Sequence, residues 1–220
     1  MKKLYGIGTG PGDKELLTIK AVKAMENSSV IFAPNNKGKN MAIDTAKDFI
    51  SNKKIILIDL PMGKVTGEDY KKAAEIILKE IPEGKIGSFL TIGDPMIYST
   101  FIYIMKELEG KDIDVEIISG IPSFVAAASA SKIPLTIKGE SLLLCDELDE
   151  NLLEKINSIV VLKTFREKEK ILDSLENNDF IFKYIKRATL EEQEIITDRE
   201  KILNDKDYIS LILGRKQGGL

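Results

Sequence analysis

Apolar and amphipathic segments alternate along the first half of the chain. Short apolar runs predict strands at 3–8, 29–33, 54–59 and 86–92. Between these runs, apolar residues recur every three or four positions, and this spacing predicts helices at 16–27, 41–50, 68–79 and 98–108. Strands that alternate with helices favour a mostly parallel sheet that carries helices on both faces.

The second half is also built from alternating segments. Apolar runs predict strands at 115–118, 141–145, 158–163, 180–185 and 208–213, and periodic runs predict helices at 124–131, 152–157 and 168–175. The acidic residues at 191–194 indicate a solvated turn. The polar stretch Glu109–Asp112 lies between the halves. We therefore expect an N-terminal α/β domain at 1–110 and a C-terminal α/β domain at 111–220.

A polar corner follows the apolar strand at 86–92. Gly93 permits a backbone conformation that is closed to other residues, and Pro95 fixes φ and donates no amide. The chain therefore turns sharply at Asp94, which is an acceptor at the carboxyl end of a strand, where ligands of α/β proteins tend to bind. The triplet by itself is equally typical of a plain tight turn.

Composition limits the kinds of partner that we expect the protein to bind. With 220 residues, 43% of them hydrophobic, the chain is long enough for one large domain or two small ones. A net charge of −3 and interleaved Lys and Glu provide no basic surface for a polyanion, so we expect no nucleic-acid partner. No apolar stretch approaches the roughly 20 residues that span a bilayer. We therefore expect no membrane partner and place the protein in the cytoplasm.

The sequence contains no histidine and a single cysteine. The missing histidine excludes Ser-His-Asp and Cys-His nucleophile systems and any His-ligated metal site, and we predict no metal centre. Cys145 lies in the apolar run 142–145, which is typical of a small buried strand residue. Any chemistry must use carboxylates, amides, hydroxyls, lysines or a cofactor.

The glycine-rich loop at 6–13 follows the first strand and precedes a helix. A β-loop-α unit of this kind suggests a dinucleotide site, in which helix amides point at a pyrophosphate. Pro11 removes an amide from the turn, and Asp13 places a carboxylate where phosphate would lie. A nucleotide-binding regulatory domain is therefore an alternative function that fits this loop poorly.

Three sequence blocks carry a resemblance to a known family. They are GIGTGPGDKELLTIKA at 6–21, FLTIGDPMIYST at 89–100 and ISGIPSFVAAASASKIPL at 118–135. In this order and spacing they resemble the tetrapyrrole methylases of corrin and sirohaem synthesis, over nearly the whole chain. The resemblance implies two α/β domains of the tetrapyrrole methylase type, a homodimer, and S-adenosylmethionine in the interdomain cleft, with the first glycine loop beside the tetrapyrrole trough.

The resemblance also assigns cofactor-binding residues to this chain. They are Pro11, Ile92, Gly93, Asp94, Met96, Ile97, Ser99, Thr100, Pro122, Ser123 and Lys163. The residue types suit the role, because Gly93 lets the backbone approach a ligand, and Asp94 can accept from an amine or hydroxyl. The chain departs from the family at 119–123, where Ser-Gly-Ile-Pro-Ser replaces the frequent Pro-Gly-Ile-Thr-Ser and removes a hydroxyl and an amide.

Three variants within the family resemblance indicate the site of reaction. Pro61-Met62, Tyr98-Ser99-Thr100 and Tyr208-Ile209-Ser210-Leu211 resemble members that methylate C20 of precorrin-2 or of its cobalt-containing form, cobalt-factor II. Methylation at another ring carbon is the alternative. The stretch Phe32–Asn35 occupies the place of an aspartate that some uroporphyrinogen-type relatives carry, which argues against their reaction.

Methyl transfer from a sulfonium to an electron-rich ring carbon is an in-line displacement that needs alignment and no covalent residue. A meso carbon must still lose its proton. The phenol of Tyr208 or solvent in the trough is the candidate base. Lys37, Lys39 and Lys64 follow strands and are candidates for contact with the many carboxylates of the substrate.

Overall fold

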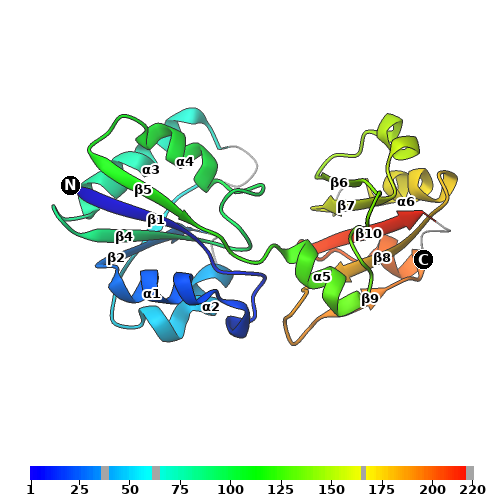
Figure 1. Cartoon of the computed structure of the whole chain (residues 1–220), viewed down its shortest axis with the longest axis horizontal. Helices are drawn as coiled ribbons and strands as arrows, with labels where there is room; N and C mark the ends of the chain where they lie inside the picture. The colour runs from blue at the N-terminus through cyan, green and yellow to red at the C-terminus, as the bar shows by residue number, and fades with distance from the viewer. Residues whose placement is uncertain (36–39, 61–64, 165–166, 217–220) are drawn as a thin grey trace. The chain divides into compact units, whose positions relative to one another are not determined.

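A computed structural model describes residues 1–35, 40–60, 65–164 and 167–216. The chain divides into two compact units, Met1–Pro122 and Ser123–Leu220 (Figure 1). Each unit has its own sheet and its own apolar core. The division follows the strand at 113–118, so it lies beyond the polar stretch 109–112 that the sequence suggests as a boundary.

The first unit is built on a parallel sheet in the order β3-β2-β4-β1-β5. Its strands are β1 (Lys2–Gly8), β2 (Val30–Pro34), β3 (Lys54–Ile58), β4 (Ile86–Thr91) and β5 (Ile113–Ile118). In β4, the positions from Gly87 to Thr91 are all buried, as expected for a central strand that is covered on both faces. β5 pairs with β1, which is why it belongs to the first unit.

Helices cover both faces of this sheet. Figure 1 shows α1 (Ile19–Asn27) and α2 (Met41–Ile50) on one face, and α3 (Gly67–Glu80) and α4 (Phe101–Leu108) on the other. Two separate clusters of buried residues lie on the two faces, one around Ile7 and Leu90 and the other around Phe89 and Phe101. This arrangement confirms the sequence prediction of a parallel sheet between two helical layers.

Side-chain caps fix where these helices begin. Thr18 accepts a hydrogen bond from the Ala21 amide at 3.2 Å, so α1 starts at Ile19, after a 3₁₀ turn (Lys14–Leu16). At α3, the amide and hydroxyl of Thr66 both donate to Asp69 in a capping box.

The second unit contains a mixed sheet in the order β6-β7-β10-β8-β9. Its strands are β6 (Leu142–Cys145), β7 (Ser158–Leu162), β8 (Phe180–Lys186), β9 (Glu194–Ile196) and β10 (Ser210–Lys216). β10 runs antiparallel to both β7 and β8. The carboxyl ends of β7 and β8 therefore lie beside the amino end of β10.

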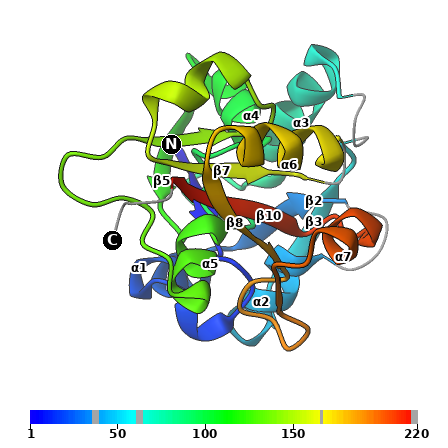
Figure 2. The same cartoon turned by 90° about the vertical axis from the view of Figure 1, so that its right-hand side faces the viewer.

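Short helical segments cover the second sheet. They are α5 (Ser123–Ser131), the 3₁₀ helix η2 (Glu150–Lys155), α6 (Lys168–Asn177) and α7 (Arg199–Asn204). Figure 2 shows α5 and α6 beside β10 and β8. Among the described residues, no helix is both long and apolar enough to cross a membrane.

Several sequence-predicted elements need correction. The helix predicted at 98–108 begins at Phe101, because residues 92–100 form turns, and the segment predicted at 152–157 is a 3₁₀ helix at 150–155. The strand predicted from Tyr208 begins at Ser210. Two elements had no predicted counterpart: β9, which starts inside the acidic segment, and α7, whose first turn is capped by Asp198.

Candidate functional site

Three loops meet at the carboxyl edge of the first sheet. They follow β1, β4 and β5, which are parallel neighbours, so their carboxyl ends lie together. The Gly93 amide donates to the Gly10 carbonyl at 2.7 Å, and the Gly10 amide donates back to the Gly93 carbonyl at 3.2 Å. The glycine loop after β1 and the Gly-Asp-Pro corner after β4 therefore form one hydrogen-bonded unit.

Glycines make this junction possible. A Cβ on Gly8 would lie 2.4 Å from the Gly93 carbonyl oxygen, and a Cβ on Gly120 would lie 2.2 Å from the same atom. Real Cβ atoms essentially never approach other atoms so closely. Gly93 itself has φ of +69°, a left-handed conformation that favours glycine. The sequence argument for Gly93 is thus confirmed, and Gly8 and Gly120 are needed for a second reason, close backbone packing.

The Asp94 carboxylate closes the junction. Its Oδ1 accepts from the Met96 amide at 2.8 Å, and its Oδ2 accepts from the Gly120 amide at 3.1 Å. Asp94 therefore links the loop after β4 to the loop after β5, which is a structural role beyond a tight turn. Each carboxylate oxygen has a second lone pair, so the group keeps acceptor capacity for a ligand.

Buried hydroxyl groups hold the same corner in place through hydrogen bonds. The Thr9 hydroxyl donates to the Thr91 carbonyl at 3.1 Å, and the Thr91 and Ser99 hydroxyls lie 3.2 Å apart. Ser99 is buried and accepts from the Phe101 amide at the start of α4. Ser99 thus holds the corner against α4 through its side chain. Sequence reasoning missed Thr9 and Thr91, because a threonine inside or next to a strand is normally only a β-former.

The outer surface of the corner is apolar and open. Ile92, Met96 and Tyr98 are 41%, 46% and 45% exposed, although they follow β4, which is buried from Gly87 to Thr91. A Cβ built on Gly93 would meet only the Pro122 Cα, at 4.0 Å, so there is space beside the Gly93 backbone. Exposed apolar side chains, an uncrowded glycine and an aspartate with acceptor capacity are the kinds of group that a small ligand with apolar and polar parts would contact.

The remaining sequence-predicted residues divide between the units. Pro11, Ile97, Thr100 and Pro122 belong to the loops of the first unit, and Pro11 is buried. In the second unit, Ser123 is the first residue of α5, whereas Lys163 follows β7 and Tyr208 precedes β10.

Pairing in the second sheet brings two of these positions to one edge. Leu211 pairs with Leu162, so Lys163 and the segment before Ser210 lie at the same end of the second sheet. Lys163 adopts a left-handed conformation with φ of +56°, and its ammonium lies 3.5 Å from Asp146 Oδ2. Tyr208 is 49% exposed. The second unit therefore brings Lys163 and Tyr208 to one end of its sheet.

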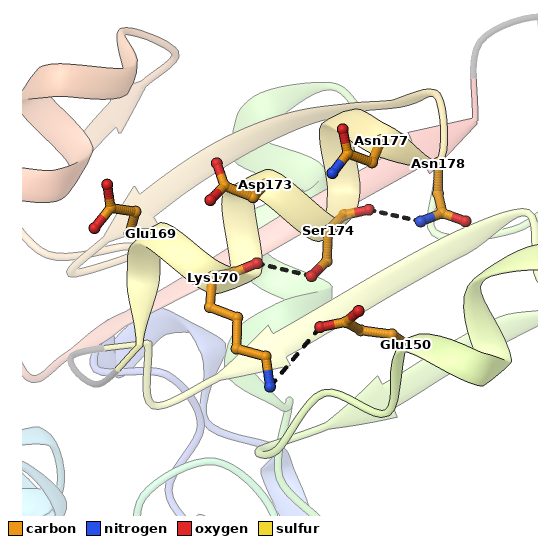
Figure 3. A pocket seen from close by; sticks show the side chains of 7 residues that line it. All are labelled: Glu150, Glu169, Lys170, Asp173, Ser174, Asn177 and Asn178. Carbon is orange, nitrogen blue, oxygen red and sulfur yellow. Dashed lines mark hydrogen bonds and ion pairs between the residues drawn. The ribbon is translucent and has the colours of Figure 1, made fainter.

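Two hollows on the second unit contain none of the predicted site residues. Figure 3 shows one of about 420 Å³ between η2 and α6, with Glu150, Glu169, Lys170, Asp173, Ser174, Asn177 and Asn178 around it. A second, next to β9 and α7, is lined by Lys186, Glu194, Ile196, Asp198, Glu200, Lys201, Asn204 and Asp205. Both are open and charged, and neither includes a residue that the sequence assigns to the site. We interpret them as solvated surface.

Several residues that the sequence singles out have no described position or no part in this corner. Lys37, Lys39, Lys64 and the pair Pro61-Met62 lie outside the described residues. Cys145 is buried at the end of β6, and burial raises the pKa of its thiol to about 11, as expected for an inert strand residue. Within the described ranges, no cluster of His, Cys, Asp and Glu has the arrangement of a metal site.

Comparison with known proteins identifies similar chains. The family model of tetrapyrrole (corrin/porphyrin) methylases matches residues 3–203. A probable cobalt-precorrin-2 C(20)-methyltransferase of Methanocaldococcus jannaschii is 36% identical over 222 residues, which cover 97% of this chain and 96% of the relative. The cobalt-precorrin-2 C(20)-methyltransferase of Salmonella typhimurium is 26% identical, with 98% and 97% covered.

A solved structure has the same fold. It is the uroporphyrin-III C-methyl transferase from Thermus thermophilus in complex with S-adenosyl homocysteine, which aligns with a TM-score of 0.70 at 17% identity. The alignment covers 97% of each chain. At this level of identity the likeness establishes the arrangement of elements.

Proposed function

Because this chain belongs to the tetrapyrrole (corrin/porphyrin) methylases, we propose that it transfers a methyl group from S-adenosylmethionine to C20 of precorrin-2 or of its cobalt-containing form. The observation that carries this assignment is the 36% identity to a probable cobalt-precorrin-2 C(20)-methyltransferase over nearly the full length of both chains. The enzyme is accordingly a methyltransferase of cobalamin biosynthesis. The same relative favours the cobalt-containing substrate.

The residues of the corner around Gly93 suit S-adenosylmethionine in chemical character. The open space beside Gly93 leaves room for the cofactor to lie against the backbone. Met96 and Ile92 can cover the apolar parts of the cofactor, and Asp94 can accept hydrogen bonds from its amine or hydroxyls. The proposed binding set also includes Ser123 and Lys163 of the second unit. A solved structure with this fold binds S-adenosyl homocysteine, the product form of the same cofactor.

When bound, the cofactor supplies the electrophilic methyl group. The residues of this chain then have to hold the sulfonium and the ring carbon in line, which can lower the barrier by roughly 7–11 kcal/mol. The junction of Gly8, Gly93 and Gly120 suits this task, because its loops pack so closely that a Cβ on Gly8 or Gly120 would clash with the Gly93 carbonyl oxygen. Tyr208, which is half exposed, is the proposed relay for the meso proton: its phenol oxygen takes up that proton as its own O–H proton passes to solvent. Solvent in the trough is the alternative acceptor.

The proposal includes three further features that the sequence analysis predicts. The enzyme works as a homodimer in the cytoplasm. Lys37, Lys39 and Lys64 contact carboxylates of the tetrapyrrole. The glycine loop at 6–13 borders the tetrapyrrole and not a nucleotide phosphate.

Cofactor binding is tested by calorimetry with S-adenosyl homocysteine, NAD and ATP. The proposal expects binding of S-adenosyl homocysteine alone. Binding of NAD or ATP without S-adenosyl homocysteine would instead support the nucleotide-binding alternative. Methylation at another ring carbon remains the second candidate reaction, and the position of the new methyl group in the product separates the two.

A further inference from the structure

Backbone strain is concentrated at one end of the second sheet. Four non-glycine residues there have left-handed φ: Lys163 at +56°, Glu167 at +54°, Arg187 at +50° and Thr189 at +72°. The first pair lies between β7 and α6, and the second pair follows β8. Such residues persist only where the surroundings hold them, and they cluster at functional sites.

A buried lysine directly follows one of these residues, Glu167, in the chain. Lys168, the first residue of α6, is only 7% exposed. Its ammonium donates to the carbonyls of Ile202 (3.1 Å) and Asp205, at the carboxyl end of α7, and lies 4.9 Å from the ring centre of Tyr184. The Lys168 ammonium therefore joins the start of α6 to the end of α7 through these two carbonyls, which compensate for the burial of its charge.

Asp205 extends this connection to β8. Its Oδ1 accepts from the Tyr184 hydroxyl at 2.8 Å, and its Oδ2 accepts from the Lys186 ammonium at 2.9 Å. The Tyr184 side chain is fully buried. Burial alone would raise the pKa of Asp205, but these hydrogen bonds and the Asp207 amide outweigh it and lower that pKa to about 2. Asp205 is therefore a carboxylate that serves as a fixed connector.

The connection continues through Asp207 to the strand ends. Asp207 accepts from Arg187 Nε and from the Ile209 amide, and its carbonyl accepts from the Ser210 hydroxyl. The Ser210 hydroxyl in turn lies 3.0 Å from that of Thr164, the residue after Lys163. Segment 205–210, which carries Tyr208, is thus held from α6, β8 and the end of β7.

We propose that Lys168 is a positioning residue for cofactor binding. Through Asp205 and Tyr184 it fixes segment 205–210, and through Ser210 and Thr164 it sets the strained backbone at Lys163. This inference rests on the proposed function, because Lys163 belongs to the proposed cofactor set. Lys168 touches no reacting atom; it acts through the backbone that the network holds.

The test is made on the full chain with Lys168→Met and, as a milder variant, Tyr184→Phe, which keeps the buried ring and removes only the hydroxyl. The control is Lys183→Met, because Lys183 also donates to a backbone carbonyl, that of Ser131 at 3.0 Å, but takes no part in the network. Calorimetry measures the Kd for S-adenosyl homocysteine, and hydrogen exchange measures the amides of 205–210.

We expect Lys168→Met to raise the Kd about tenfold or more, because the variant releases segment 205–210 and the backbone at Lys163. Exchange at 205–210 should accelerate in parallel. Tyr184→Phe should show a smaller change of the same kind, and Lys183→Met should leave the Kd within about twofold of wild type.

If the network variants loosen 205–210 but bind as tightly as wild type, the inference is overturned and the proposed function stands. The same conclusion follows if Lys168→Met does not fold and Tyr184→Phe binds like wild type. If the wild-type protein itself fails to bind S-adenosyl homocysteine, the proposed function is overturned and the inference with it.

Discussion

The Gly120 amide donates a hydrogen bond to Asp94 Oδ2 at 3.1 Å, and this bond joins the loop after β5 to the loop after β4. The other oxygen of the carboxylate accepts from Met96 within the corner itself. One side chain therefore maintains both the local turn and the contact between neighbouring loops. A cofactor that binds to this corner depends on Asp94 twice, once as an acceptor and once as a support.

Asp94→Ala should weaken cofactor binding more than it weakens the fold. Two backbone amides lose their acceptor, which costs about 1–3 kcal/mol of stability if water does not replace it. The Kd for S-adenosyl homocysteine should rise about tenfold or more, since the ligand also loses an acceptor. Calorimetry and urea unfolding measure the two effects. An unfolded variant, or a folded one with unchanged Kd, would contradict the dual role.

Asp94→Asn separates the two contributions. Its amide oxygen can replace one carboxylate oxygen as acceptor, but its NH₂ group faces the other backbone donor. We expect a Kd between those of wild type and Asp94→Ala.

Gly120→Ala should disrupt the junction, because the added Cβ would lie 2.2 Å from the Gly93 carbonyl oxygen. We expect a loss of about 2–3 kcal/mol in the free energy of unfolding and a large loss of cofactor affinity. Gly67→Ala is the matched control, because a Cβ there meets nothing within 4 Å. Equal stability of the two variants in urea would contradict the close packing.

The three-loop junction shows which structural features local sequence patterns can predict and which they cannot. The run at 86–92 and the residues Gly93 and Pro95 were enough to predict a buried strand and a sharp turn, since each acts through local conformation. The need for glycine at Gly8 and Gly120 could not be predicted, because it depends on contacts between loops that are distant in sequence. The same holds for Thr9 and Thr91.

The second sheet was harder to predict than the first. β9 is short, and its residues Glu194–Ile196 follow an acidic stretch with no alternating pattern, so its pairing with β8 could not be foreseen. The buried Lys168 is the clearest case. A lysine at a helix start normally indicates solvent exposure, and only the carbonyls of Ile202 and Asp205 explain its burial.

Asp205 should make stability depend on pH in the acid range. Its pKa is about 2 in the folded protein against a model-peptide value of 3.8. A depressed carboxyl pKa adds stability that is complete above the unfolded pKa and is lost as the pH falls through the folded one. The stability advantage of wild type over Asp205→Asn should therefore shrink by on the order of 2 kcal/mol between about pH 5 and pH 2. A constant difference in urea unfolding across this range would contradict the prediction.

Cys145 should be unreactive in the folded protein. Burial raises the pKa of its thiol from 9.0 to about 11, so the thiolate fraction near neutral pH is about 100-fold lower than for a free cysteine. Labelling with a thiol reagent at pH 8 should be at least that much slower in buffer than in about 6 M urea, and it should accelerate as the pH rises. Fast labelling of the folded chain would show that the thiol is accessible.

The position of the transferred methyl group gives the strictest test of the proposed reaction. Cobalt-factor II and precorrin-2 are each incubated with the enzyme and S-adenosylmethionine labelled with carbon-13 at its methyl group, and the products are analysed by mass spectrometry and carbon NMR. We expect one methyl group to be added, at C20, with the cobalt-containing substrate preferred. A labelled methyl group at another ring carbon, such as C11 or C17, would keep the family and the cofactor but contradict the assigned reaction.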